Sequence, residues 1–214
     1  MLDFQNYRSI LCLDGELPDH AFFIKNKLPI IAADGAANQL AKMSITPAII
    51  IGDLDRADPN LFQHTEVLHL PNQNTSDFQK CLAYLKEHDL LPAIITGVSG
   101  GYLDHILNNI NIFLATDSIL YAPPIIGFGL RADTRVELSS PLDSKISLLG
   151  IPNAVVTTHG LKWELQSQTL AYPGQNSCFN RTQYETFKIH VEQGQLLVLL
   201  YEKQMQDAGS LNLS

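Results

Sequence analysis

The feature that most constrains the fold is a regular alternation of short apolar runs with segments of helical period between residues 8 and 121. The runs have the length of buried strands and lie at 9–13, 29–33, 48–51, 66–70, 93–96 and 118–121. The segments at 19–27, 36–43, 76–88 and 104–116 repeat apolar residues every three or four positions. This alternation predicts an α/β fold, a mostly parallel sheet with helices on both faces.

The pattern changes after Pro123-Pro124, where β-type runs follow one another without a convincing helix between them. They lie at 125–128, 134–138, 144–148, 154–158, 187–191 and 196–201, separated by Gly, Pro, Asn and Asp. Such a succession indicates an antiparallel sandwich or barrel. We therefore expect an α/β domain at 1–122, an all-β domain at 123–203 and a disordered tail at 204–214.

Composition excludes several classes of protein. The net charge of −8 and the absence of clustered Lys and Arg argue against a nucleic-acid partner. No apolar stretch reaches the roughly 18 residues that span a bilayer, and no signal segment opens the chain, so we expect a cytoplasmic protein without a membrane partner. Three cysteines without CxxC spacing are expected to be buried, reduced thiols rather than a disulfide or zinc site.

Acidic residues follow the apolar runs at Asp34, Asp53, Asp55 and Asp104. Because ligands of parallel sheets bind outside the carboxyl ends of the strands, these residues predict a metal–phosphate site. If the strand continues through Asp53 and Asp55, both side chains leave one face and can share Mg²⁺. An exposed turn is the alternative for this pair.

The segment 33–38, Ala-Asp-Gly-Ala-Ala-Asn, joins an expected strand to an expected helix. Its small residues allow a ligand to approach backbone N–H groups at a helix N-terminus, where an anion is favoured. For Asp34 the alternative is a helix N-cap. Asn38 faces either a ligand or solvent.

Asp77 and Lys80 open the helix expected at 76–88 and, three residues apart, share one of its faces. A carboxylate beside an ammonium suits a metal-bound phosphate. The alternative is a capped helix that carries a weak surface ion pair.

The segment 97–101 fits GxSxG, the turn that exposes the nucleophile of serine hydrolases. Ser99 would then pair with Asp133 and with His159 or His190, which follow in the required order. However, such a fold continues its strand–helix alternation, whereas this chain turns purely β.

The other interpretation of 97–105 is a glycine turn that approaches a nucleotide, with Asp104 joining the acidic cluster. His105 is then expected to pack at the start of the helix. Neither a P-loop nor a dinucleotide GxGxxG occurs, so the familiar nucleotide folds are not supported.

Five motifs in this order resemble the thiamine pyrophosphokinase family: ADGAAN, GDLD, PNQNTSDFQK, GVSGGYLDH and GLKWEL. The resemblance covers nearly the whole chain. It implies an α/β domain followed by a β-sandwich, in a homodimer whose active sites form at the subunit interface. It also implies Mg²⁺-dependent transfer of pyrophosphate from ATP to thiamine, which gives thiamine diphosphate and AMP.

The resemblance also assigns roles to residues. It implies catalytic roles for Asp53, Asp55, Asp77, Lys80 and Asp104, with metal ligation by Asp53, Asp55 and Asp77. It implies nucleotide binding by Asp34, Gly35, Asn38, Gln73, Gly100 and Gly101. Thiamine contact is implied for Trp163, Ser177 and Asn180, and an aromatic face suits the cationic thiazolium. Either Asp77 or Asp104 orients the attacking hydroxyl.

Some positions depart from the family pattern, because Asn72 and Asn74 replace aspartates and Tyr102 replaces an arginine. These changes remove charge that binds metal and phosphate. Arg56, where the family has a serine, and Arg131 are the candidates to compensate for Tyr102. Three alternatives therefore stay open: a kinase for another alcohol such as a pterin, a non-catalytic thiamine or nucleotide sensor, and the serine hydrolase.

Overall fold

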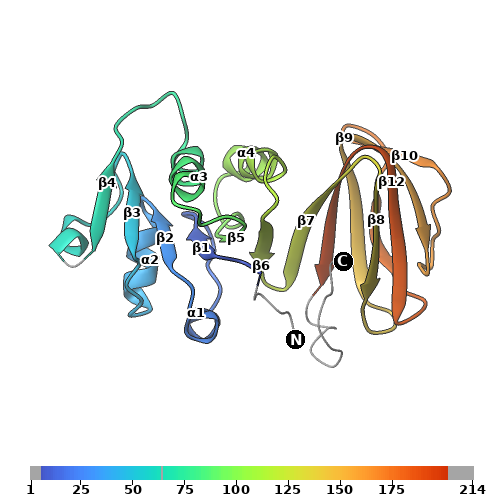
Figure 1. The fold of residues 1–214 in the computed structure, drawn as a ribbon, viewed down its shortest axis with the longest axis horizontal. Helices are drawn as coiled ribbons and strands as arrows, with labels where there is room; N and C mark the ends of the chain where they lie inside the picture. Colours follow the sequence, from blue (N-terminus) through green and yellow to red (C-terminus); the bar gives the residue numbers. More distant parts are fainter. Residues whose placement is uncertain (1–5, 64, 202–214) are drawn as a thin grey trace. The chain divides into compact units, whose positions relative to one another are not determined.

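The structure, a computed structural model, describes residues 6–63 and 65–201 (Figure 1). The tail predicted at 204–214 lies outside the described residues. The chain divides into two compact units, of which one ends at Ala122 and the other begins at Pro123. We call them the α/β unit and the β unit and describe each by itself.

The α/β unit is built on a parallel sheet, as the sequence predicts. Its strands are β1 (Ser9–Cys12), β2 (Ile30–Ala33), β3 (Ile49–Gly52), β4 (Glu66–His69), β5 (Ala93–Thr96) and β6 (Ile119–Ala122). Their order is β6-β5-β1-β2-β3-β4, and every neighbouring pair is parallel. Strands β1, β3 and β5 are buried throughout because both faces of the sheet are covered.

Four α-helices cover this sheet: α1 (His20–Asn26), α2 (Ala36–Lys42), α3 (Asp77–Glu87) and α4 (Leu103–Phe113). Figure 1 shows α3 and α4 on one face and α1 and α2 on the other, and a short 3₁₀ helix, η1 (Pro59–Gln63), precedes β4. The chain runs outward from β1 to β4 and returns to the other side of β1 as β5. The carboxyl ends of β1 and β5 thus flank a topological switch point, where α/β sheets bind ligands.

The β unit is antiparallel. Its strands are β7 (Ile125–Arg131), β8 (Thr134–Ser139), β9 (Lys145–His159), β10 (Gln168–Ala171), β11 (Ser177–Arg181) and β12 (Thr186–Tyr201). The first half of β12 pairs with β8 and its second half pairs with β7, while β9 lies alongside both halves. In the same way β9 pairs with β11 at its start and with β10 further along. The two long strands therefore pass from one layer of a sandwich to the other.

Two expectations about this unit were wrong. The runs at 144–148 and 154–158 are parts of β9, and those at 187–191 and 196–201 are parts of β12. The register shifts where each strand changes layer, around residues 150–154 and 191–196, and this bulge breaks the apolar pattern without ending the strand. Strands β10 and β11 escaped detection because their sequences, QTLA and SCFNR, are short and mix polar with apolar residues.

The core of the β unit lies between its layers, where fifteen buried side chains form one cluster that includes Phe128, Leu148, Val156, Phe187 and Val198. In the α/β unit Cys12 and Cys81 are buried free thiols, as expected, whereas Cys178 in the β unit is exposed. No helix in the described part of the chain is long and apolar enough to cross a membrane.

Candidate active site

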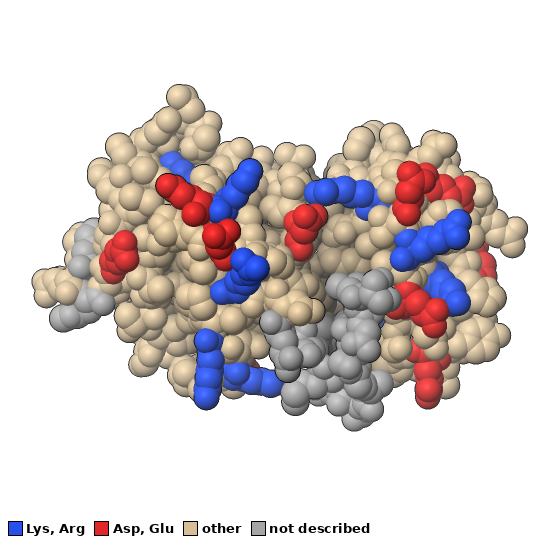
Figure 2. Space-filling view, viewed as in Figure 1, with Lys and Arg blue, Asp and Glu red and all other residues tan. Residues whose placement is uncertain are grey.

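A cavity of about 410 Å³ opens at the carboxyl ends of the parallel strands, at the switch point of the α/β unit. Four stretches line it: the residues after β1, those after β3, the start of α3, and the turn between β5 and α4. On the face shown in Figure 2, acidic and basic side chains lie side by side over this unit, without a block of one sign. The chemistry of the cavity therefore depends on specific pairs.

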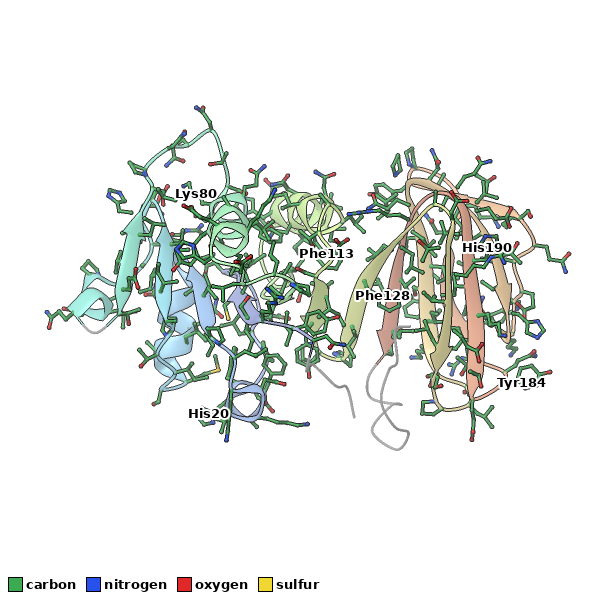
Figure 3. All side chains as sticks on the ribbon, viewed as in Figure 1. His20, Lys80, Phe113, Phe128, Tyr184 and His190 are labelled. Carbon is green, nitrogen blue, oxygen red and sulfur yellow. The ribbon has the colours of Figure 1, made fainter. Side chains whose placement is uncertain are left out.

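Lys80, labelled in Figure 3, lies in the first turns of α3 and forms an ion pair with Asp77. Lys80 Nζ donates to Asp77 Oδ1 at 2.8 Å, and only 5% of the Lys80 side chain is exposed. The helix begins in a capping box, in which the Ser76 hydroxyl accepts from the Gln79 backbone and Gln79 accepts from the Ser76 backbone. The pair is thus largely buried on a fixed helix end, and the surface ion pair considered above is excluded.

Asp53 follows β3 and is held by Gln73, whose Nε2 donates to Asp53 Oδ2 at 2.5 Å. This hydrogen bond is the main reason why the pKa of Asp53 lies below its usual value. The carboxylate is therefore ionised well below neutral pH and ready to bind a cation.

Asp34 follows β2 and is fully buried, in a left-handed conformation with φ 41°. Its carboxylate accepts from the Ala57 backbone at 3.1 Å and from Arg56 Nε at 3.2 Å. The N-cap of helix α2 is Gly35, without a side-chain cap, so Asp34 is not an N-cap. It anchors the turn after β3 instead.

Asn38 anchors the same turn from the first turn of α2. Its Nδ2 donates to the Arg56 carbonyl at 2.7 Å, and its Oδ1 accepts from the Asp58 backbone at 2.8 Å. Both ends of the Asn38 amide are therefore bonded to the protein, whereas the sequence analysis expected Asn38 to face either a ligand or solvent.

Carboxylate oxygens of Asp34, Asp53 and Asp77 lie within 4.8 Å of one another and form the candidate metal site. Three hard oxygen donors suit Mg²⁺. The prediction placed Asp55 in this set, but β3 ends at Gly52 and Leu54 adopts φ 64°, so the strand does not continue. The side chain of Asp55 lines the cavity but is 70% exposed, outside the cluster.

Asp14 is a site residue that the sequence analysis missed. It lines the cavity and accepts from Arg56 Nη1 at 2.9 Å and from Gln39 Nε2 at 3.1 Å. A Cβ on Gly35 would lie 2.5 Å from Asp14 Oδ2, so this carboxylate occupies the space expected for a ligand. Asp14 follows an apolar run just as Asp34 does, and the same signal identifies it.

The turn between β5 and α4 is a glycine turn, with φ 76° at Gly97 and 89° at Gly100. Gly100 lies against Glu16, whose backbone donates to the Ser99 carbonyl at 2.6 Å. Gly101 lines the cavity with open space at its Cβ position. Of this turn, Gly101 is the glycine that leaves room for a ligand.

The residues after this turn differ from expectation. Asp104 is exposed, accepts from the His105 backbone at 2.9 Å, and does not line the cavity. Tyr102 is 80% exposed and also lies outside the cavity lining. His105, expected to pack at the helix start, is instead exposed and lines the cavity. Helix α4 begins at Leu103, which turns His105 rather than Asp104 toward the cavity.

The predicted thiamine residues lie together in the β unit. Asn180 is buried and makes four hydrogen bonds: it donates to the Trp163 carbonyl and Ser177 Oγ and accepts from the backbones of Trp163 and Arg181. Trp163 is 54% exposed, and Lys162 Nζ lies 4.9 Å from the centroid of its ring. Asn180 thus fixes a loop that presents an indole to solvent.

Both halves of the chain match patterns of one family. The pattern described as "Thiamin pyrophosphokinase, catalytic domain" matches residues 21–120, and "Thiamin pyrophosphokinase, vitamin B1 binding domain" matches residues 134–196. The chain belongs to the thiamin pyrophosphokinase family. The resemblance stated from the motifs is thereby confirmed.

Individual members of the family are distant relatives. Thiamine pyrophosphokinase 1 of Oryza sativa subsp. japonica is 26% identical and aligns with 85% of this chain and 82% of its own. The Arabidopsis thaliana protein of the same name is 27% identical, over 85% of this chain and 73% of its own.

Solved structures share the fold. Yeast thiamin pyrophosphokinase superposes with a TM-score of 0.79 at 19% identity, over 95% of this chain and 89% of its own. The Bacillus subtilis enzyme gives a TM-score of 0.75 at 17% identity, over 91% and 99%. Membership of this family assigns the 97–105 segment to a kinase, and Ser99 is not among the described residues that line the cavity. The serine hydrolase alternative is set aside.

Proposed function

We infer that the chain is a thiamine pyrophosphokinase, which transfers a pyrophosphoryl group from ATP to the hydroxyl of thiamine and releases AMP. The observation that carries this inference is a cluster of three carboxylates, two of which line the cavity, beside the buried ammonium of Lys80, in a chain that belongs to this family. Hard anionic ligands beside a fixed cation suit a magnesium nucleotide.

We propose that Asp53 and Asp77 hold Mg²⁺, with Asp34 at the buried side of the same cluster. The bound ion supplies charge neutralisation on the phosphates of ATP. Gln73 fixes the Asp53 carboxylate and keeps it ionised, and Lys80 fixes Asp77. Each proposed ligand is thus oriented by a neighbour.

The chemical step is an in-line displacement at the β-phosphorus of ATP. The thiamine hydroxyl oxygen forms a bond to this phosphorus and gives up its proton to solvent water, and the bond to the oxygen bridging the α- and β-phosphorus breaks, so that AMP leaves with the electron pair. Lys80, beside Asp77, stabilises negative charge on the transferred group. Of the two carboxylates predicted to orient the hydroxyl, Asp77 lines the cavity and Asp104 does not, so we assign this role to Asp77.

In the β unit, we propose that the exposed indole of Trp163 binds the thiamine ring system. Lys162 already lies over this ring at 4.9 Å, which leaves the opposite face for the thiazolium cation. Asn180 and Ser177 position the Trp163 loop rather than offer free groups to a ligand, because the Asn180 amide donates to the Trp163 carbonyl and to Ser177 Oγ.

The resemblance to the family further supports a homodimer in which the β unit of one chain completes the site of the other. We also retain the cytoplasmic location as a proposal. The oligomeric state is measured directly by light scattering coupled to size-exclusion chromatography. An active protein that is a monomer at the concentration of the activity assay would refute a site shared between two chains.

The test is AMP release by the pure protein with MgCl₂, ATP and thiamine, in which each of the three is omitted in turn. We expect release only with all three present. Asp77→Asn lowers kcat/KM by about 100-fold or more, the range for removing one transition-state contact. Glu87→Gln, on the exposed end of the same helix, is the matched control and keeps full activity. Thiamine binding without AMP release identifies a sensor and refutes the proposal, and release with a pterin alcohol instead of thiamine identifies a different acceptor.

A further inference from the structure

We propose that Arg56 is the guanidinium that binds the polyphosphate of the magnesium nucleotide in this chain. The proposal rests on the function proposed above and adds to it a residue outside the metal cluster and the Lys80 pair. It is argued from the position of Arg56, its free donors and the way in which it is held.

Arg56 and Lys80 carry the permanent positive charges among the described residues that line the cavity. They differ in access, because 5% of the Lys80 side chain is exposed and 52% of the Arg56 side chain. Lys80 is also engaged with Asp77 at 2.8 Å. Arg56 is therefore the more accessible of the two cations for a ligand that enters the cavity.

The guanidinium is held through two of its three nitrogens. Its Nε donates to Asp34 at 3.2 Å and its Nη1 donates to Asp14 at 2.9 Å. Asp55 Oδ1 also lies 3.6 Å from Nε. A guanidinium carries five N–H groups in a planar fork, and Nη2 has no partner within the described part of the chain. The two N–H groups of Nη2 are thus available to phosphate oxygens, which the fork fits in pairs.

The backbone that carries Arg56 is held as firmly as its side chain. Asn38 donates to the Arg56 carbonyl, and Asp34 accepts from the Ala57 backbone. Asp34 is buried, so its charge needs both of the hydrogen bonds that its carboxylate accepts, from the Ala57 backbone and from Arg56 Nε. The fork is consequently oriented before a ligand arrives, so that little conformational entropy is lost on binding.

The surrounding charge determines which anion binds. Four carboxylates, Asp14, Asp53, Asp55 and Asp77, line the cavity against the two cations. A bare polyphosphate meets net repulsion there, whereas in its magnesium complex the ion offsets two of the negative charges and offers a cation to the carboxylates. We therefore expect Arg56 to contribute to binding of magnesium polyphosphate, and the metal-free anion to bind weakly or not at all.

The test is calorimetric titration of inorganic tripolyphosphate, with and without MgCl₂, because this probe has phosphates but no nucleoside. We compare the wild type with Arg56→Gln, Arg56→Lys and the control Arg8→Gln, an exposed arginine of the same unit that bonds to the Asp89 carbonyl. Loss of a charged hydrogen bond predicts that Arg56→Gln binds magnesium tripolyphosphate about 10- to 150-fold more weakly. The affinity of Arg56→Lys lies between those of Arg56→Gln and the wild type, because one ammonium cannot both hold the carboxylates and reach the ligand. The affinity of Arg8→Gln equals that of the wild type.

A purely structural role of Arg56 gives a different result. It disturbs the whole site, so that KM rises equally for ATP and thiamine, whereas phosphate binding raises KM for ATP alone. Affinity of Arg56→Gln within twofold of the wild type, equal effects on the two KM values, or no binding of magnesium tripolyphosphate by the wild type would each overturn the proposal. If Arg56→Gln misfolds, the graded loss in Arg56→Lys decides the question. Wild-type protein that binds the probe through Arg56 but releases no AMP refutes the proposed function and leaves the role of Arg56 intact.

Discussion

Replacing Lys80 by methionine is a severe test of how the start of helix α3 is built. The substitution keeps an unbranched side chain of similar length and removes the ammonium that bonds to Asp77 at 2.8 Å. The Asp77 carboxylate then remains in a largely buried position without a cation, since 18% of its side chain is exposed. Both the stability of the α/β unit and the charge of the cavity should change.

Breaking a buried ion pair from one side destabilises a protein by about 3 to 5 kcal/mol. We expect about 3 kcal/mol for Lys80→Met, the lower end of this range, because Asp77 keeps some contact with water. Removing the second charge as well, in Asp77→Asn/Lys80→Met, relieves the unpaired carboxylate. The double variant should therefore be more stable than the sum of the two single effects, by more than about 1 kcal/mol.

The two units permit separate measurements within one sample. The four α-helices all lie in the α/β unit, so ellipticity at 222 nm reports its unfolding by urea. Trp163, the single tryptophan, lies in the β unit, and its fluorescence is an internal control. With a slope of about 2 kcal/mol per molar urea, Lys80→Met lowers the midpoint of the helical transition by about 1.5 M. The fluorescence transition should not move.

Additive effects of the two single substitutions would refute this reasoning, because they would mean that Asp77 and Lys80 do not depend on each other. A helical transition of unchanged midpoint would do so as well. Pyrophosphoryl transfer should be lost in all three variants, including the double variant whose stability recovers. Recovery of activity together with stability would show that Lys80 is needed only for folding.

Two further predictions concern the groups that hold other site residues. Asn180→Ala removes the side chain that fixes the Trp163 loop. In steady-state kinetics this variant should show a KM for thiamine raised about tenfold or more and an unchanged KM for ATP. Equal changes in the two KM values would contradict this prediction. Gln73→Leu removes the bond that holds the pKa of Asp53 low, so the carboxylate takes up its proton at a higher pH. Mg²⁺ affinity, measured by calorimetry, should then fall at about pH 4, close to the ordinary pKa of an aspartate, and change little at pH 8, and a loss of equal size at both would exclude titration of Asp53 as the cause.

The α/β unit was predictable because its strands are continuous apolar runs and its helices have one apolar face. The predicted runs differ from the observed strands by about one residue at each end, as for 29–33 and β2 (Ile30–Ala33). The β unit was predictable in class but not in detail. Its long strands bend between layers at bulges, and β11 pairs through a polar sequence whose burial depends on partners far along the chain.

The candidate site was predictable in location, because strand-end carboxylates gather wherever parallel strands end together. Which carboxylates turn inward was not predictable, since this depends on single backbone angles. Leu54 at φ 64° ends the strand direction, so Asp55 lines the cavity outside the three-carboxylate cluster, and Asp34 at φ 41° turns back to hold Arg56. The roles of Asn38 and Asn180 as supports are likewise visible only from their partners.

The central claim is that this cavity supports transfer of an intact pyrophosphoryl group to thiamine. The most direct measurement uses ATP labelled at its β-phosphorus, with the products separated and the label located. We predict equal amounts of thiamine diphosphate and AMP, with the label entirely in thiamine diphosphate and no ADP formed. Formation of ADP with thiamine monophosphate, or no labelled thiamine product at all, would contradict the account.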